Sequence, residues 1–200
     1  FVKELEPPAG YVLNETEQDI DLSFEGDFTM EVLREVTCTE QVCRQPFQLI
    51  KISSDGTGTE GNLLEGAQFM AYLKSGLQKK ADGSYDFDNA IPVKIGRNGE
   101  SVLTTDSKGY ALSAPLPYGT YVVRESFAPH NMQPVNPFEV TIRENKPEEP
   151  QVWRVFIDRE FQAKLRIVKI DAATKKAVLV PGAEFKIYDL DENKYVEMIT

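Results

Sequence analysis

The chain has 200 residues, of which 41% are hydrophobic, and a formal net charge of −10. This length and composition support one large or two small hydrophobic cores and exclude a disordered chain. Acidic residues (32) outnumber basic ones (22), and no basic run offers a contact for phosphate groups, so nucleic acid and anionic membrane surfaces are not expected partners.

The two ends of the sequence carry no targeting signal. There is no initiator methionine, no signal peptide and no apolar run long enough to span a bilayer. The chain begins at Phe1 inside one strand-like segment and ends at Thr200 inside another. We therefore expect a fragment of a longer polypeptide, and we expect this fragment to make no membrane contact.

Short strands separated by frequent turns are predicted in the middle of the chain. Runs with strand propensity lie at 47–53, 67–73, 101–104, 110–114, 119–126, 137–143 and 152–158. Turn signals such as "SSDGTG", "KKADGS", "RNGE" and "DSKG" separate them, and only "GLQKKA" suggests a turn of helix. This pattern predicts an all-β fold, an antiparallel β-sandwich.

Two unrelated features occur twice in the sequence. "FQLIKISSDGTGTEGNLLEGAQFMAYL" and "AKLRIVKIDAATKKAVLVPGAEFKIYD" each give an apolar strand, a lysine, a polar turn and Gly-Ala-x-Phe, which aligns Lys51 with Lys169. "FVKELEPPAGY" parallels "VVRESFAPHNM", which aligns Glu4 with Glu125. Because both features recur at nearly one spacing, we predict tandem domains of about 120 residues.

The repeat spacing predicts three pieces. Residues 1–45 would be the C-terminal part of a first domain, residues 46–162 a complete domain, and residues 163–200 the N-terminal part of a third. The lysine strand opens each domain and the glutamate strand comes late in it.

The two cysteines, Cys38 and Cys43, lie close together in "TCTEQVC". A zinc site would need more ligands nearby, and the only histidine, His130, is distant in the sequence. We therefore predict no metal site. The pair is expected to form a small disulfide loop or to remain two free thiols, and an extracellular protein would favour the disulfide.

Three ionisable residues stand on predicted strands. In "FQLIKIS", "YVVRESF" and "VWRVFIDRE", strand alternation lets Lys51, Glu125 and Asp158 share a face with apolar neighbours. Adjacent residues such as Ile50 and Ile157 are also apolar, so alternation alone does not determine which face is inward. The alternative is a lysine whose ammonium group reaches water and an aspartate that caps a turn.

If the three side chains are buried together, a specific reaction becomes available. Burial disfavours ionised forms, which leaves a neutral Lys51 amine as nucleophile and a protonated Asp158 carboxyl as electrophile. Glu125 between them can polarise the carbonyl and shuttle protons. The product would be an amide between the two side chains, with water released, and folding would hold the reacting groups in place.

These motifs resemble one known family. "LPYGTYVVRESFAP" resembles the late-strand signature of Cna protein B-type and SpaA-like domains of Gram-positive surface adhesins and pilins, roughly G-T-Y-x-V/L-x-E-x-x-A-P-x-G-Y. "FVKELEPPAGY" has its Pro-x-Gly-Tyr end, where the middle domain has Asn131 and Met132. "LEGAQFMAY" and "VPGAEFKIYD" resemble the early Gly-Ala-x-Phe strand. The resemblance covers essentially the whole chain, in the family's order.

The resemblance implies a prealbumin-like, Ig-related sandwich that often carries a self-formed Lys–Asp or Lys–Asn isopeptide bond. By position, it implies Lys51 as the amine, Asp158 as the acceptor and Glu125 as the catalytic acid. It also implies an extracellular location, on the cell-wall-attached surface of a Gram-positive bacterium, which favours the disulfide between Cys38 and Cys43.

The flanking pieces depart from the family pattern. Glu4 and Lys169 are candidates for incomplete sites, whose other members lie elsewhere. Counting from Glu4 by the separation between the central glutamate and aspartate reaches Thr37, with no obvious Asn or Asp nearby. We therefore expect the first domain to lack the bond. Glu184 in "GAEF" is expected to be an ordinary strand residue.

The favoured function is a structural stalk module. A crosslink between the first and last strands would make the sandwich nearly inextensible and resistant to proteases, which suits a stalk that holds an adhesin away from the cell wall. The expected partners are neighbouring domains of the same surface protein.

The alternative function is a ligand-binding adhesin module. Residues 74–100 form a long excursion with aromatic and acidic residues, including Tyr85, Phe87 and Asp88, that can meet a host extracellular protein or a glycan. The spacing of a calcium loop is absent there. A turnover enzyme is disfavoured, because no catalytic triad, metal cluster or phosphate loop is recognisable, so single-turnover formation of the crosslink, without a cofactor, is the only catalysis expected.

Overall fold

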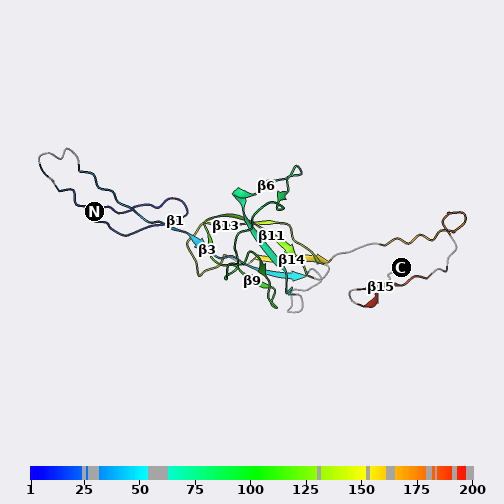
Figure 1. The fold of residues 1–200 in the computed structure, drawn as a ribbon. Coiled ribbons are helices and arrows are strands. Elements are labelled where there is room, and N and C mark those ends of the chain that lie inside the picture. The colour runs from blue at the N-terminus through cyan, green and yellow to red at the C-terminus, as the bar shows by residue number, and fades with distance from the viewer. Residues whose placement is uncertain are drawn as a thin grey trace. The chain divides into compact units, whose positions relative to one another are not determined.

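The computed structural model describes residues 1–23, 26, 32–53, 63–129, 132–151, 154–160, 165–178, 182, 184–190 and 193–196 (Figure 1). The chain divides into two compact units, Phe1–Phe161 and Gln162–Thr200. None of the helical structure in the described ranges is long and apolar enough to cross a membrane.

Among the described residues of the first unit, regular structure consists of short strands and one 3₁₀ turn, η2 (Lys74–Gly76). The strands are β1 (Tyr11–Val12), β2 (Gln41–Val42), β3 (Arg44–Gln45), β4 (Gln48–Ser53), β5 (Gln68–Leu73), β6 (Gln78–Lys79), β7 (Tyr85–Asp86), β8 (Leu103–Thr104), β9 (Tyr110–Leu112), β10 (Leu116–Pro117), β11 (Gly119–Phe127), β12 (Met132–Gln133), β13 (Phe138–Ile142) and β14 (Arg154–Glu160). The second unit contains an antiparallel pair, β15 (Ile187–Asp189) and β16 (Lys194–Val196).

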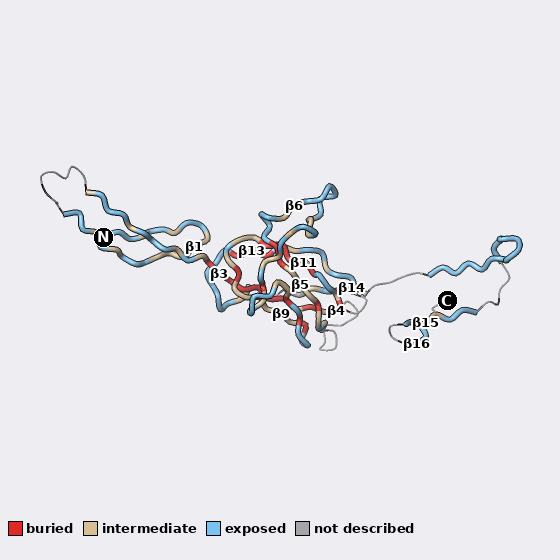
Figure 2. The backbone as a smooth tube through the Cα atoms, viewed as in Figure 1, coloured by how far each residue is buried: buried red, intermediate tan, exposed pale blue. Residues whose placement is uncertain are grey.

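Two four-stranded sheets form the body of the first unit, in the orders β13-β11-β5-β8 and β12-β14-β4-β9. Residues of both sheets, such as Phe69 and Val123 of the first and Leu49 of the second, belong to one buried apolar cluster. The two sheets therefore pack as a sandwich. Figure 2 shows where the buried residues gather, and within the described ranges all of them lie between Cys43 and Asp158.

One pair of strands runs parallel. Among the described strands, β4 and β14 pair in parallel, with Lys51 opposite Phe156, while the other neighbours in the two sheets are antiparallel. The predicted all-β sandwich is confirmed, and this pair is its exception to antiparallel order. A parallel pair requires a crossover between its strands, and here the crossover is the rest of the domain.

Strands β4, β5, β11 and β13 match the predictions within one residue at each end, whereas β14 ends two residues beyond the predicted 152–158. The helical turn predicted in "GLQKKA" is wrong. The 3₁₀ turn ends at Gly76, and Gln78 and Lys79 form a ladder with β7. That ladder satisfies backbone groups that one isolated helical turn would leave without partners.

Outside the two four-stranded sheets the described strands form short pairs, one of which joins distant segments, β3 with β10. In residues 1–45, β1 pairs with β2 and Val2 bridges to Gln18. In the second unit, Ile170 bridges to Ala177. The three-piece division with boundaries near residues 45 and 162 stays a prediction.

Candidate functional site

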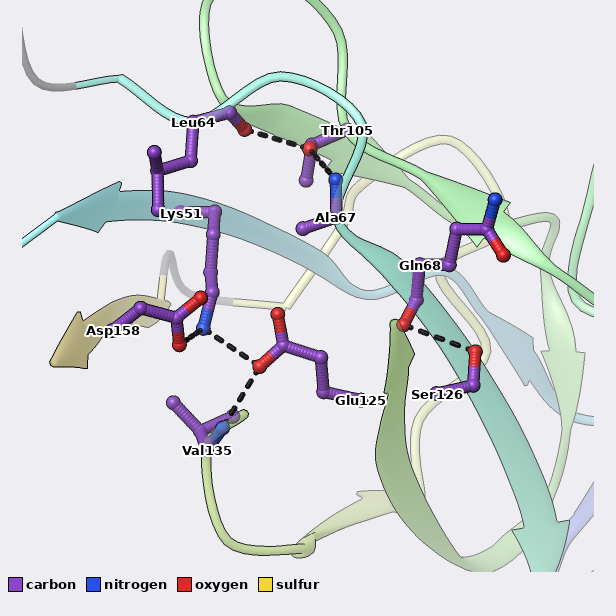
Figure 3. A network of polar contacts seen from close by, with 9 residues as sticks. All are labelled: Lys51, Leu64, Ala67, Gln68, Thr105, Glu125, Ser126, Val135 and Asp158. Carbon is purple, nitrogen blue, oxygen red and sulfur yellow. Dashed lines mark hydrogen bonds and ion pairs between the residues drawn. The ribbon is translucent and has the colours of Figure 1, made fainter. Parts of the chain in front are cut away.

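Strands β4, β11 and β14 bring Lys51, Glu125 and Asp158 together inside the sandwich (Figure 3). The Lys51 ammonium nitrogen Nζ donates to Glu125 Oε2 at 2.8 Å and also to Asp158 Oδ1. All three side chains are completely buried, with 0% of their surface exposed. The lysine therefore lies between two carboxyl groups, out of contact with solvent.

Strand alternation explains this placement. On β4, Leu49, Lys51 and Ser53 are buried, while the residues between them are only partly buried. Because Ile50 and Ile52 take the outer face, the ambiguity left by the sequence is resolved with Lys51 inward. The parallel register then sets Asp158 one inward position beyond the residue opposite Lys51.

The backbone of Lys51 is held on both sides. Its N–H donates to the Gly109 carbonyl at 2.7 Å, and its carbonyl accepts from the Leu64 N–H at 3.0 Å. Gly109 has φ +64, and a Cβ atom there would lie 2.3 Å from the Lys51 carbonyl oxygen. Only glycine combines this left-handed conformation with such a close approach.

Glu125 is oriented by the end of its strand. The register of β11 against β5 shifts between Glu125 and Phe127, which marks a bulge, and the Ser126 hydroxyl donates to the Gln68 carbonyl at 3.2 Å beside it. On its other side, Glu125 Oε2 accepts from the backbone N–H of Val135 at 2.8 Å. Bulges commonly direct side chains near functional sites, and this one comes directly after the glutamate.

Aromatic residues lie beside Lys51, on β5 and at the position of β14 opposite it. Lys51 Nζ lies 5.8 Å from the centre of the Phe69 ring, and Phe138 stacks on Phe156 at 4.1 Å between β13 and β14. These rings exclude water and strengthen every charge interaction among the three groups.

The electrostatics favour an additional proton. Burial raises the pKa of the Glu125 carboxyl above its ordinary value of 4.5, while hydrogen bonds from Lys51 and Val135 oppose the rise. When all three groups are ionised, one positive and two negative charges leave a net negative charge in the interior, which is costly. Glu125 Oε1 and Asp158 Oδ2 are also buried and accept no hydrogen bond from the described residues. One bound proton would remove the excess charge.

The other predicted residues have different environments. Glu4 accepts a hydrogen bond from the Asn14 backbone N–H at 2.7 Å, and Lys169 and Glu184 are exposed. His130 lies outside the described residues. Within the described part of the chain, His, Cys, Asp and Glu form no group of three that could hold a metal ion.

The predicted disulfide is not formed in the structure. Cys38 and Cys43 are free thiols, the first exposed and the second buried. Hydrogen bonds on both sides, from the Cys43 N–H to the Gly10 carbonyl and from the Tyr118 N–H to the Cys43 carbonyl, hold this residue in the interior. A disulfide requires both side chains to turn toward each other, and these two have opposite environments.

Sequence reasoning missed two supporting residues. "DSKG" was read only as a turn, although Gly109 in it contacts the Lys51 backbone. Val135 contributes a backbone N–H, which carries no side-chain signal. The glycine of this turn is the one feature of the sequence that could have indicated the contact of Gly109 with the lysine strand.

Comparisons with known proteins place the chain in a family. Residues 46–153 match the family described as SpaA, a prealbumin-like fold domain. Because the match covers more than half of the chain, the chain belongs to the SpaA family of prealbumin-like domains. None of the curated proteins matches the sequence.

Solved structures give the same fold. The chain is similar to the Bacillus anthracis TIE protein, with 25% identity and a TM-score of 0.52, over 98% of this chain and 30% of that protein. Lower scores relate it to the minor pilin GBS52 of Streptococcus agalactiae (19% identity, TM-score 0.44, 65% of this chain and 51% of that one). The chain is also similar to the shaft pilin SpaA of Lactobacillus rhamnosus GG, with 16% identity and a TM-score of 0.40, over 62% of this chain and 50% of that one. The chain thus spans less than a third of the TIE protein.

Proposed function

We propose that this chain is a structural stalk module of a Gram-positive surface adhesin or pilin, stiffened by a self-formed isopeptide bond between Lys51 and Asp158. The carrying observation is the completely buried lysine in contact with two carboxyl groups. Membership of the SpaA family, whose motifs resemble adhesin and pilin domains, supports the role. The module would lie outside the cell, in a protein attached to the cell wall.

The proposed reaction is a condensation. Lys51 passes a proton to Glu125, and the neutral amine attacks the carboxyl carbon of protonated Asp158. A C–N bond forms, and the C–O bond to the hydroxyl breaks. Glu125 returns its proton to the departing hydroxyl, which leaves as water, and then takes up the second proton that the nitrogen loses as it becomes an amide. The reaction needs no cofactor and occurs once per chain.

The position of the bond suits a mechanical role. Lys51 and Asp158 lie on β4 and β14, adjacent parallel strands near the two ends of the sandwich domain. A pull on both ends of the domain would load these two strands in shear. With the amide formed, tension would pass from β4 to β14 directly. The chain between the two residues, which are 107 positions apart, would then not be extended.

The long excursion is anchored to the sandwich, which favours a structural role for it as well. The Phe87 ring packs 5.0 Å from Tyr72, and the Arg124 guanidinium lies 4.9 Å from the Phe87 ring. Glu139 of β13 accepts from Lys74 and from Tyr85. Binding of a host protein or glycan by residues 74–100 stays a prediction without a specific contact to favour it.

The test of the proposed function is the intact mass of the purified chain after reduction. We expect a deficit of one water, which disappears in Lys51→Ala and in Glu125→Ala. Lys74→Ala removes a half-exposed lysine of the turn η2 and should keep the deficit. A full, unmodified mass of the wild-type chain would refute the proposal.

A further inference from the structure

We propose that Asn98 is a site of spontaneous side-chain deamidation, in which the Gly99 backbone nitrogen is the nucleophile and the Glu100 carboxylate restrains the reaction. The site lies in the turn "RNGE", at the end of the long excursion 74–100. The proposal goes beyond the proposed function and does not depend on it, because it uses neither Lys51 nor the carboxyl groups beside that lysine.

Asn98 and Gly99 form the only Asn-Gly pair of the chain. The backbone nitrogen that follows an asparagine can attack the asparagine's side-chain carbonyl carbon, because the chain itself holds the two groups close together. Most residues crowd this nitrogen with a Cβ atom, which glycine lacks. Asn98 is also exposed, so that water reaches it. The pair therefore has the highest intrinsic reactivity among the asparagines of this chain.

The reaction exchanges ammonia for water. The Gly99 nitrogen attacks the carbonyl carbon of the Asn98 side chain, and a C–N bond forms. The bond from that carbon to the amide nitrogen Nδ2 breaks, and the departing group takes up the proton that Gly99 has lost and leaves as ammonia. Water then opens the cyclic imide at one of its two carbonyl carbons, which leaves aspartate or isoaspartate at position 98.

Glu100 holds Asn98 by two hydrogen bonds. Asn98 Nδ2 donates to Glu100 Oε1 at 3.0 Å, and the backbone N–H of Asn98 donates to Glu100 Oε2, also at 3.0 Å. Because both the side chain and the backbone of Asn98 are bound to one carboxylate, the side chain has little freedom to rotate toward the Gly99 nitrogen. The same bond ties the leaving nitrogen to Glu100.

The nucleophile is restrained as well. The Gly99 N–H donates to the Gly96 carbonyl at 3.1 Å, and a hydrogen-bonded amide loses its proton only when the bond opens. The Glu100 carbonyl accepts from the Ile95 N–H at 2.8 Å and from the Gly96 N–H at 2.9 Å, which keeps the turn closed.

The charge of Glu100 acts in the same direction. Hydrogen bonds from its own backbone N–H and from the Asn98 side chain lower the pKa of the Glu100 carboxyl below its ordinary value of 4.5, so the group is ionised at neutral pH. A negative charge on the adjacent side chain disfavours loss of the Gly99 amide proton. An ionised carboxylate also has no proton to give to the leaving nitrogen.

Gly96 leaves the space that this carboxylate occupies. A Cβ atom at position 96 would lie 2.2 Å from Glu100 Oε2. Gly96→Ala therefore displaces the carboxylate without removing it, which gives a second way to release Asn98.

Deamidation would weaken the turn that carries it. Aspartate at position 98 has no amide to donate to Glu100 and adds a second negative charge beside it. Isoaspartate lengthens the backbone between Ile95 and Glu100, whose hydrogen bond closes the turn. Ile95 is completely buried in the core of the sandwich, so the damage would reach the core and lower the melting temperature.

The experiment incubates the folded chain in mildly alkaline buffer made with heavy-oxygen water and maps the modified peptides by mass spectrometry. We expect Asn98 to take up labelled oxygen slowly in the wild-type chain and rapidly in urea. Glu100→Ala and Gly96→Ala should each accelerate the reaction about 10-fold in the folded chain, the factor expected for loss of a hydrogen bond to a charged group. Thermal melting checks that both variants are folded.

Two controls are built into the chain. Asn136 is exposed like Asn98 but precedes Pro137, whose nitrogen has no hydrogen, so Asn136 should stay intact in every sample. Glu65→Ala removes an exposed glutamate of another turn and should leave the Asn98 rate unchanged.

The outcomes test the two parts of the proposal separately. An Asn98 that stays intact in urea overturns the site. Equal Asn98 rates in the folded wild type, Glu100→Ala and Gly96→Ala overturn the restraint by Glu100. None of these results bears on the Lys51–Asp158 bond, which the intact mass reports as a deficit of one water.

Discussion

The central site and residues 1–45 contain corresponding two-residue ladders, β12 with β14 and β1 with β2, but differ in burial. In the center, Lys51, Glu125 and Asp158 are completely enclosed, whereas Glu4 and Glu40 are only partly buried. The difference is the lysine strand, which β4 supplies in one place and no described strand supplies in the other. The comparison teaches that the late strands arrange the carboxyl groups, while the first strand closes the core and brings the charge that makes their burial tolerable.

The largest expected effect comes from removing the central lysine. Lys51→Ala leaves two carboxyl groups in the core without a cation, and it also removes the crosslink. We expect the free energy of unfolding to fall by about 3–5 kcal/mol or more, and the melting temperature by roughly 10 °C or more, measured by calorimetry. Lys74→Ala, which breaks a half-exposed ion pair with Glu139, should change the melting temperature little, because solvent screens exposed ion pairs. Similar melting temperatures for the two variants would contradict this account.

The next effect separates the two roles of Glu125. Glu125→Gln keeps an oxygen that can accept a hydrogen bond from the Val135 N–H. The amide cannot accept and return a proton as a carboxylate does. We expect the fold to remain and the rate of water loss after refolding to fall about 100-fold or more, followed by mass spectrometry. Glu139→Gln on the outer face should leave the rate unchanged. Equal rates for both variants would show that Glu125 only positions its neighbours.

Gly109 and Leu64 hold the Lys51 backbone by hydrogen bonds, an arrangement called the clamp below, and the described residues of 1–45 have no counterpart to it. Gly109→Ala sets a Cβ 2.3 Å from the Lys51 carbonyl oxygen in a left-handed conformation. We expect a loss of about 1–3 kcal/mol in unfolding free energy and slower crosslinking, both measured on freshly refolded chain. Gly83→Ala, at a similar φ of +84 with open space around it, is the matched control. A larger loss for Gly83→Ala would contradict the clamp.

The raised pKa of Glu125 predicts a dependence of stability on pH. Below the ordinary value of 4.5 the carboxyl is protonated in both states, and between that value and its raised pKa it is protonated only in the folded chain. In uncrosslinked Lys51→Ala, burial persists, so unfolding free energy should fall as pH rises through the raised pKa, by up to about 1.4 kcal/mol per pH unit. Urea titrations at several pH values measure the slope. Adding Glu125→Gln should flatten it, and an unchanged slope would refute the assignment.

The smallest effect on stability is expected for a change outside the Lys51–Glu125–Asp158 site. Phe87→Ala removes a ring that packs on Tyr72 and lies beneath Arg124. We expect a loss of about 1–2 kcal/mol in chemical unfolding, with crosslinking unchanged in the mass spectrum. A loss of crosslinking in this variant would show that the excursion supports the site from the outer face of its sheet.

Much of this architecture could be predicted from local sequence. Turn residues and β-propensity located β4, β5 and β11, because these signals act within a few residues. The repeat singled out Lys51 and Glu125, strand alternation added Asp158, and the family resemblance implied the role of each. These predictions needed only the order of the residues.

Other features depended on contacts between distant segments. Alternation could not orient Lys51, since Ile50 and Ile52 are also apolar; the packing of two sheets decided its face. Pairing between distant segments also determines that Cys38 is exposed while Cys43 is buried. It likewise brings Gly109 close to the Lys51 backbone. The sequence by itself determined which side chains can react, and the tertiary structure decided which of them meet, because burial and register are properties of paired strands and not of single ones.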